Sequence, residues 1–212
     1  DFLIHAATPV SNDNKDFDSN IDIIVNGTQN ALLFAEKNQV KNFLLISSGA
    51  VYGEMPQDLN CFSESYVPKD SFFQFQSAYI TGKRISELLA LHWAKRTNQH
   101  LSIARCFAFS GRYLPLNQHF AIGNFIRDAL TQKRIEIKGD GSALRSYMDE
   151  EDLVLWLLTI LIKGNKDDIY NVGSDVEISI KELAQKIAGL VPGTIVNVQG
   201  QELLDAKRNR YV

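Results

Sequence analysis

The chain has 212 residues, of which 45% are hydrophobic and 22% are charged, a composition typical of one large globular domain or two small ones. The net charge is −3, and the scattered Lys and Arg residues form no basic stripe of the kind that binds nucleic acid. No apolar run reaches the roughly 18–20 residues that span a bilayer, so we expect no membrane partner. Cys61 and Cys106 lack metal-ligand spacing, and two lone cysteines fit a reducing cytoplasm.

The first half of the chain alternates apolar runs of strand length with segments of helical periodicity. In chain order we expect a strand at 2–7, a loop at 13–20, a helix at 21–38, a strand at 43–46, a loop at 53–70, a helix at 77–98 and a strand at 101–109. Buried strands that alternate with helices predict a doubly wound parallel sheet of the α/β class. Ligands bind beyond the carboxyl ends of such strands, which here are residues 5–7, 47–49 and 110–111.

After Gly111 the pattern changes, and we expect a second, smaller α/β lobe. Its elements would be a loop at 112–118, a helix at 123–132, a strand at 133–137, a turn at 139–141, an apolar helix at 152–162, a strand at 168–172 and a helix at 179–190. Asp152 is the expected N-cap of the apolar helix, and Ser179 and Glu182 have the spacing of a capping box. We therefore divide the chain into residues 1–111 and 112–212, with one or two later elements returning to the first sheet.

Tyr79 and Lys83 are the first candidates for chemistry, because residues four apart lie on one face of a helix. A nearby ammonium group favours the phenolate and lowers the pKa of a tyrosine, which is ordinarily near 10. Such a tyrosine can take a proton from a hydroxyl group while hydride leaves the same carbon. Ser48, at the end of the preceding strand, could bond to the same oxygen. By itself the pair could equally be an ordinary surface contact on a helix.

The surroundings of this pair carry a family resemblance. The relevant segments are DFLIHAA at 1–7, NGTQN at 26–30, FLLISSGAVYG at 43–53, SAYITGK at 77–83, KGDGSALRSY at 138–147 and YNVG at 170–173. In order and in sequence they resemble the extended short-chain dehydrogenase/reductase family, in its nucleotide-sugar epimerase/dehydratase branch. The resemblance implies a Rossmann-like doubly wound sheet whose N-terminal strands are missing here, together with a smaller substrate-binding lobe.

The same resemblance implies specific roles for residues. The catalytic residues would be Ser48, Tyr79 and Lys83. The cofactor-binding residues would be His5, Ala6, Ala7, Ser47, Tyr79 and Lys83. The substrate-binding residues would be Ser48, Asn124 and Arg145, with Arg145 on the diphosphate. The implied cofactor is NAD, with NADP as the alternative, the implied partner is a nucleotide-diphosphate sugar, and no metal is implied.

Three of these residues also have simpler explanations. His5 ends an apolar strand, and we interpret it as a packed histidine that lines the cofactor pocket and not as a base. Arg145 could be a surface arginine on a loop, although the preceding Gly-Asp-Gly turn favours a functional role. Asn124 could be an ordinary polar residue near the start of a helix.

The glycine-rich motif G-x-x-G-x-x-G, which holds a dinucleotide pyrophosphate at a helix N-terminus, does not occur in the 212 residues. We therefore expect the chain to be a fragment of a longer enzyme, inactive by itself, that binds NAD weakly or not at all. The strand at 2–7 would then form an exposed sheet edge, which favours a homodimer or self-association through that strand.

Further departures concern the reaction. Gly49 and Ala50 stand where the 4,6-dehydratases of the family carry Asp and Glu, and the sugar decarboxylases usually carry Glu near this point. Ala108 and Ile24 replace two asparagines of the family pattern. The leading hypothesis is therefore an NAD-dependent 4-epimerase acting through a 4-keto sugar. The alternatives are a 4,6-dehydratase, a 4-keto-sugar reductase, or a non-catalytic fragment that binds a nucleotide sugar or a protein.

Overall fold

The computed structural model describes residues 1–8, 17–68, 78–118, 120–201 and 209–212. These residues belong to two compact units. Unit 1 consists of Asp1–Gly53, Ser63–Phe107 and Asp152–Val172, and unit 2 consists of Glu54–Phe62, Ala108–Glu151 and Gly173–Val212. The segment at 152–172 thus returns to the unit that contains the start of the chain.

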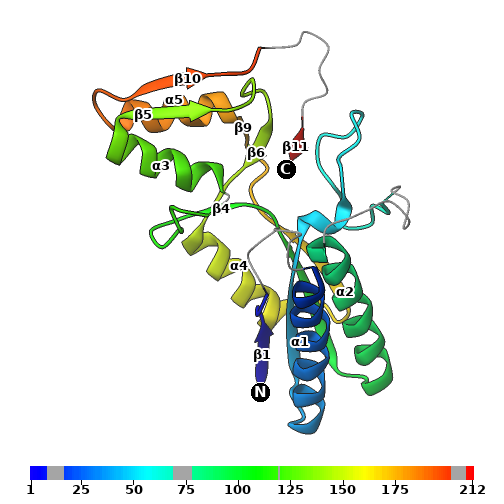
Figure 1. Ribbon diagram of the computed structural model, residues 1–212. Helices are drawn as coiled ribbons and strands as arrows, with labels where there is room; N and C mark the ends of the chain where they lie inside the picture. Colours follow the sequence, from blue (N-terminus) through cyan, green and yellow to red (C-terminus); the bar gives the residue numbers. More distant parts are fainter. Residues whose placement is uncertain (9–16, 69–77, 119, 202–208) are drawn as a thin grey trace. The chain divides into compact units, whose positions relative to one another are not determined.

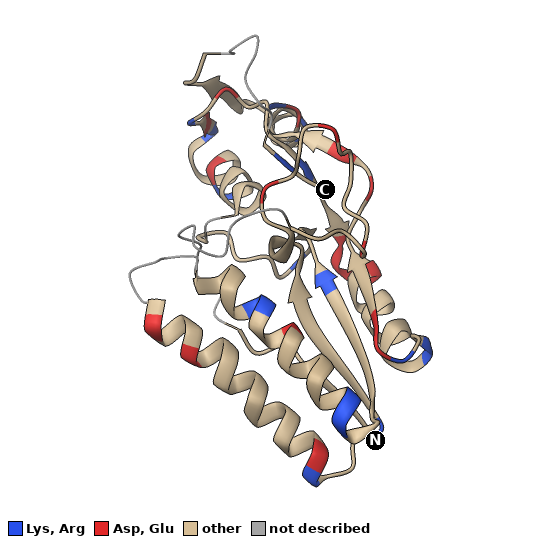
Figure 2. Cartoon of the chain, turned by 90° about the vertical axis from the view of Figure 1, so that its right-hand side faces the viewer, with Lys and Arg blue, Asp and Glu red and all other residues tan. Residues whose placement is uncertain are grey.

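Unit 1 is built on a parallel four-stranded sheet with the strand order β1-β2-β3-β8. Its strands are β1 (Phe2–His5), β2 (Asn42–Ser48), β3 (His100–Cys106) and β8 (Asp168–Val172). The helices α1 (Phe17–Lys37) and α2 (Ala78–Thr97) lie side by side on one face of the sheet, and α4 (Glu150–Lys163) lies on the other (Figures 1 and 2). The doubly wound parallel α/β fold predicted from the sequence is confirmed.

The core of unit 1 lies between the sheet and the α1/α2 pair. Its fully buried members are Leu32, Ala35, Val40, Phe43, Leu45, Ala90, Trp93, Ala94, Leu101 and Ile103. Phe43 of β2 and Trp93 of α2 pack with their ring centroids 5.4 Å apart. The two helices approach closely at Gly82, where an added Cβ atom would lie 3.0 Å from Cγ2 of Ile24. This packing holds α2, and therefore Tyr79 and Lys83, against the sheet.

The described residues of unit 2 form three small sheets and two helices. Its strands are β4 (Phe109–Ser110), β5 (Arg134–Ile137), β6 (Leu144–Ser146), β7 (Met148–Asp149), β9 (Glu177–Ser179), β10 (Ile195–Val198) and β11 (Arg210–Tyr211), which pair as β4-β7, β10-β5 and β11-β6-β9. The helices α3 (Ala121–Gln132) and α5 (Ile180–Leu190) pack on β5 and bury an apolar cluster of their own. The capping box predicted for Ser179 and Glu182 is confirmed at the start of α5.

Three predicted boundaries are wrong. A loop is expected at 13–20, but within the described residues the chain is helical from Phe17, and 13–16 lie outside them. The polar Asp18 and Asn20 suggest a loop. They lie in the first turn of α1, where the acidic Asp18 favours the helix because it suits the helix dipole. Helix α4 begins at Glu150 and not after Asp152, since Asp149 Oδ1 accepts the backbone N–H of Glu151 at 2.8 Å. The run at 101–109 divides into β3 and the separate short strand β4.

Charged residues are scattered over the described part of the chain, and Figure 2 shows Lys and Arg interspersed with Asp and Glu. Among the described helices none combines the length and the apolar character that a membrane crossing requires.

Candidate active site

Ser48 is the last residue of β2 and the N-cap of the short 3-10 helix η2 (Gly49–Tyr52). Its Oγ accepts the backbone N–H of Ala50 at 3.2 Å, which satisfies one of the free donors at the start of that helix. The side chains of Ser48 and Tyr79 are also hydrogen-bonded to each other. The carboxyl end of β2 therefore carries a hydroxyl group aimed at the first turn of α2.

Tyr79 and Lys83 lie one turn apart on α2, as predicted from their spacing. Lys83 is only 4% exposed, and its Nζ donates a hydrogen bond to the carbonyl of Ile46 at 2.8 Å. The same ammonium lies 5.8 Å from the centroid of the Tyr79 ring. The structure thus brings Ser48, Tyr79 and Lys83 together within unit 1.

Burial controls the ionisation of this group. It lowers the pKa of Lys83 to about 8, while Cys106 and Glu87 act in the opposite direction. It also raises the pKa of Tyr79, against the hydrogen bond with Ser48, which lowers it. A neighbouring cation alone would lower the pKa of Tyr79, so the raised pKa is opposite to the sequence prediction. At neutral pH this structure therefore holds Tyr79 as a phenol beside a cationic Lys83.

His5 is a buried residue at the carboxyl end of β1. Its Nε2 lies 3.2 Å from Oγ1 of Thr28, and the Thr28 hydroxyl also contacts the carbonyl of Ile24 and the hydroxyl of Ser86. Burial and the charge of Lys83 lower the pKa of His5, which makes it a neutral packed side chain. Ala6 and Ala7 follow it as exposed residues.

Ser47, which the sequence predicts to bind the cofactor, uses its hydroxyl to donate to Oε1 of Glu87. That carboxylate also binds Arg105 of β3, with Nε on Oε1 at 3.0 Å and Nη2 on Oε2 at 2.6 Å. The sequence reasoning missed this buried ion pair. The available signals were a carboxylate four residues after Lys83 and a lone arginine inside an apolar strand.

The predicted substrate residues lie in unit 2. Arg145 is on β6, where its Nη1 donates to the carbonyls of Leu144 at 2.7 Å and Asn209 at 3.1 Å. Burial lowers the pKa of Arg145, and Tyr147 and Tyr211 act in the opposite direction. Asn124 is on α3, and its Oδ1 accepts a hydrogen bond from Nη1 of Arg127 at 3.0 Å. Arg145 and Asn124 therefore lie on separate elements of unit 2, and the hydrogen-bond partners given for each also belong to unit 2.

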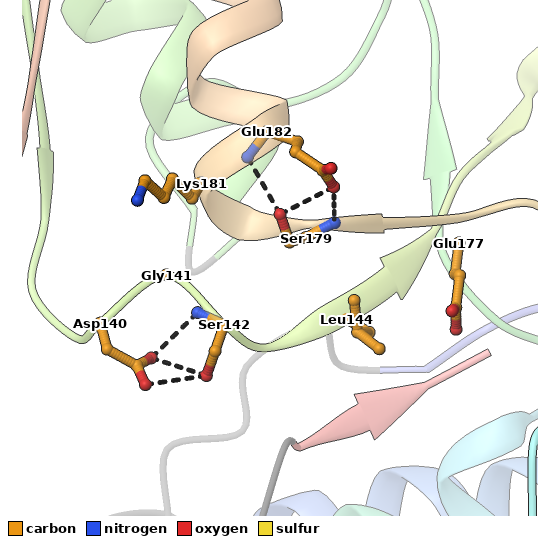
Figure 3. A pocket seen from close by; sticks show the side chains of 8 residues that line it. All are labelled: Asp140, Gly141, Ser142, Leu144, Glu177, Ser179, Lys181 and Glu182. Carbon is orange, nitrogen blue, oxygen red and sulfur yellow. Dashed lines mark hydrogen bonds between the residues drawn. The ribbon is translucent and has the colours of Figure 1, made fainter. Parts of the chain in front are cut away.

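A pocket of about 370 Å³ in unit 2 is formed around the Gly-Asp-Gly turn (Figure 3). It is lined by Asp140, Gly141, Ser142, Leu144, Glu177, Ser179, Lys181 and Glu182. The Asp140 carboxylate accepts the backbone N–H and the hydroxyl of Ser142, and a Cβ atom on Gly141 would lie 2.8 Å from Cβ of Lys181. The turn thus needs its glycine for close packing against α5. The described residues include no cluster of three or more His, Cys, Asp and Glu side chains placed to hold a metal ion.

Curated relatives with sequence similarity are sugar-modifying enzymes. UDP-glucuronic acid decarboxylase 4 of Arabidopsis thaliana is 30% identical over 189 residues, which cover 88% of this chain and 42% of that protein. UDP-glucuronic acid decarboxylase 1 of Danio rerio is 29% identical over 193 residues, which cover 90% of this chain and 45% of that protein. The chain thus spans less than half the length of these two relatives.

Three solved structures illustrate the similarity in fold. The UDP-glucose 4-epimerase of Thermotoga maritima with UDP-glucose has a TM-score of 0.84 and 19% identity, covering 99% of this chain and 66% of that one. RMD of Pseudomonas aeruginosa with NADPH has a TM-score of 0.82 and 26% identity, covering 98% and 69%. The dTDP-glucose 4,6-dehydratase of Bacillus anthracis with NAD has a TM-score of 0.77 and 21% identity, covering 98% and 61%.

A family model provides the most direct assignment. It describes the NAD dependent epimerase/dehydratase family and matches residues 1–173. The match includes Ser48, Tyr79 and Lys83 as well as the four strands of the parallel sheet. We conclude that the chain belongs to the NAD-dependent epimerase/dehydratase family.

Proposed function

We propose that this chain carries the catalytic residues of an enzyme that modifies a nucleotide sugar through a 4-keto intermediate, with 4-epimerisation as the net reaction. Its family and the grouping of Ser48, Tyr79 and Lys83 support the chemistry. The observation that carries the choice of epimerisation is the absence of an acid or base at positions 49 and 50.

The residues of unit 1 fit the nicotinamide side of the family's cofactor. Lys83 is a buried cation beside Tyr79, and the exposed Ala6 and Ala7 leave the sheet at the same edge as Ser48, since β1 and β2 are parallel. Together with His5 and Ser47 they are the residues that would contact NAD or NADP. When bound, the nicotinamide would take a hydride from the sugar and return it.

The protein residues would then handle the accompanying proton. Tyr79, ionised to its phenolate, would accept the proton of the sugar 4-hydroxyl as the C4–H bond breaks, and would return it when the ketone is reduced on its other face. The Ser48 hydroxyl would donate to the same sugar oxygen. Because burial raises the pKa of Tyr79, the phenolate depends on the positive charge of Lys83. Arg145 and Asn124 are the candidates for the nucleotide diphosphate and the sugar.

Gly49 explains why an elimination is disfavoured. A Cβ atom at this position would lie 2.7 Å from the ring of Phe107, so the packing leaves no room for an acidic side chain. Ala50 is next to it and carries no ionisable group. Expulsion of a hydroxyl group needs an acid and a base near the leaving group, whereas epimerisation needs only hydride transfer and one shuttled proton.

A second candidate reaction is decarboxylation of a nucleotide-linked uronic acid. The similarity to the Arabidopsis UDP-glucuronic acid decarboxylase, which covers 88% of this chain, favours it. A 4-keto uronic acid is a β-keto acid, so it can lose carbon dioxide without an acid that expels hydroxide. The sugar decarboxylases of the family usually carry Glu near this point, so Gly49 and Ala50 still favour epimerisation over decarboxylation.

The test uses the polypeptide that carries these 212 residues, purified at its full encoded length. UDP-, dTDP-, GDP- and CDP-sugars, including UDP-glucuronic acid, are added singly, and the products are identified by NMR. An epimer without net consumption of NAD(P)H supports the proposal, and release of carbon dioxide supports decarboxylation. A 4-keto-6-deoxy product indicates a dehydratase, and stoichiometric oxidation of NAD(P)H indicates a reductase. No conversion of any sugar would favour the non-catalytic alternative.

We also propose that β1 pairs with β1 of a second copy of the chain. Among the described residues β1 is bonded on one side only, to β2, and its Phe2 and Ile4 are exposed. The surface of α4 also favours association, because this helix exposes five large apolar side chains: Val154, Leu155, Trp156, Leu158 and Ile162. An unpaired apolar edge readily adds a strand from another molecule.

A further inference from the structure

Three successive residues at the end of β2 each bond to a different residue on one face of α2. The Ile46 carbonyl accepts the Lys83 ammonium at 2.8 Å. The Ser47 hydroxyl donates to Glu87. The Ser48 side chain is hydrogen-bonded to that of Tyr79. Because positions 79, 83 and 87 are spaced by four, one stripe of α2 holds the whole strand end.

Glu87 is the unusual member of this stripe, because a carboxylate is buried there. The residue is 6% exposed, and both of its oxygens are used: Oε1 accepts from Ser47 and from Nε of Arg105, and Oε2 accepts from Nη2 of Arg105. The two-point contact with a guanidinium group fixes the orientation of the carboxylate as well as its position.

Arg105 is itself held in place. Its guanidinium carbon lies 4.7 Å from the centroid of the Tyr52 ring, and its Nη1 donates to the carbonyl of Glu64 at 3.3 Å. Tyr52 in turn donates to Oδ1 of Asn171 at 2.8 Å. The ion pair is therefore supported by β3, β8 and the segment after η2, which limits the movement of the Glu87 carboxylate.

The charges around Lys83 give the carboxylate a second effect. The ionisable groups that face Lys83 are His5 from β1, Cys106 from β3, and Tyr79 and Glu87 from its own helix. The pKa of His5 is lowered, that of Tyr79 is raised, and that of Cys106 is raised to about 12, so all three are neutral at neutral pH. Of these described groups, Glu87 is the one that carries a negative charge at neutral pH, and that charge acts on both the Arg105 guanidinium and the buried ammonium.

We propose that Glu87 is a positioning residue for the active site: its carboxylate, oriented by Arg105, holds the end of β2 against α2 and keeps Lys83 cationic. The proposal rests on the catalytic role proposed for Lys83. The ionisation of Lys83 can nevertheless be measured without substrate or cofactor. The role of Glu87 and the catalytic role of Lys83 can therefore be contradicted separately. A residue that only stabilised the fold would leave that ionisation unchanged.

The test is an NMR titration of the 212-residue chain labelled with ¹³C at the Cε atoms of lysine, with the Lys83 signal identified by its loss in Lys83→Arg. In the wild-type chain we expect a midpoint of about 8. In Glu87→Gln, which keeps the shape of the side chain but removes the charge, we expect the midpoint to fall by roughly one unit. Glu36→Gln is the matched control, since it breaks an exposed ion pair with Arg96 on the α1/α2 surface and should not shift Lys83.

The loss of one partner from a buried ion pair can unfold a protein, because the other charge remains uncompensated. The double variant Glu87→Gln/Arg105→Gln avoids this. Because it removes the Arg105 cation together with the carboxylate, the Lys83 midpoint should still fall, but by less than in Glu87→Gln. An unchanged Lys83 midpoint in whichever of the two variants is folded, as judged by circular dichroism, would overturn the proposal. A fall of equal size in Glu36→Gln would also overturn it.

Discussion

The ring of Phe107 packs directly on Gly49, and a Cβ atom at position 49 would lie 2.7 Å from its Cε1. We therefore expect Gly49→Ala to lower the free energy of unfolding by about 1–3 kcal/mol, the usual cost of overpacking a core. Urea denaturation of the wild-type chain and of Gly49→Ala measures this difference in the free energy of unfolding. Gly27→Ala is the matched control, because nothing lies within 4 Å of its Cβ position. On a helix that change should stabilise by about 1 kcal/mol. A neutral Gly49→Ala would show that position 49 can accept a side chain and would weaken the argument against elimination.

Tyr79 is the proposed proton carrier. Tyr79→Phe removes the hydroxyl and should lower kcat about 10²–10⁴-fold with little change in KM, because the proton transfer occurs only during the reaction. The measurement uses the full encoded polypeptide and whichever sugar it converts. Tyr113→Phe, at an exposed tyrosine of unit 2, should leave kcat unchanged. Full activity of Tyr79→Phe would remove this residue from the mechanism.

The buried Lys83 predicts a pH dependence of stability. Its pKa is about 8 in the folded chain and 10.5 for a fully solvated lysine, so between these values the unfolded chain binds the additional proton. Below pH about 8, Lys83 therefore lowers the free energy of unfolding the most. As the pH rises from about 8 to 10.5, this destabilising effect should decrease, so the chain should become more stable.

Comparison of wild type with Lys83→Met by urea denaturation isolates this effect. The difference, wild type minus variant, should increase with pH over that window. A difference that is constant or decreases would mean that Lys83 is not disfavoured as a cation in the folded chain.

The 212-residue chain should bind NAD weakly, because its sequence has no glycine-rich turn for the pyrophosphate. Isothermal titration calorimetry should give a dissociation constant weaker than micromolar for NAD and for NADP. Tighter binding would mean that other residues hold the pyrophosphate, and the titration of variants of Lys83 would then show whether the nicotinamide side is used.

The exposed edge of the sheet should cause self-association. We expect sedimentation of the chain to show dimers or larger species, and Ile4→Lys to shift them towards the monomer, since a charge on an edge strand opposes strand addition. Leu190→Lys, which changes an exposed apolar residue of unit 2, is the control and should not alter the distribution. A concentrated wild-type chain that remains monomeric would contradict the proposed pairing of β1.

The elements that are read most reliably from the sequence are those with a local cause. The apolar runs predict the parallel sheet, and Ser179 with Glu182 predicts the start of α5, because a capping box involves only neighbouring residues. Asp152 is the wrong N-cap because four consecutive acidic residues offer the same local signal, and the backbone uses Asp149.

Effects that depend on burial could not be predicted in this way. The spacing of Tyr79 and Lys83 indicates proximity, but the direction of the Tyr79 pKa follows from how deeply the phenol is buried. The Glu87–Arg105 pair joins residues on different elements, and neither its burial nor its contact with Ser47 can be seen in a single run of sequence.

The contact of Gly82 with Ile24 sets how far α2 stands from α1. Gly82 directly precedes Lys83, and the Ile24 side chain on α1 is accommodated because Gly82 on α2 has no side chain. A methyl group at position 82 would press the two helices apart and draw the Lys83 ammonium away from the Ile46 carbonyl. The spacing between α1 and α2 at this contact therefore affects how the Lys83 ammonium reaches the end of β2.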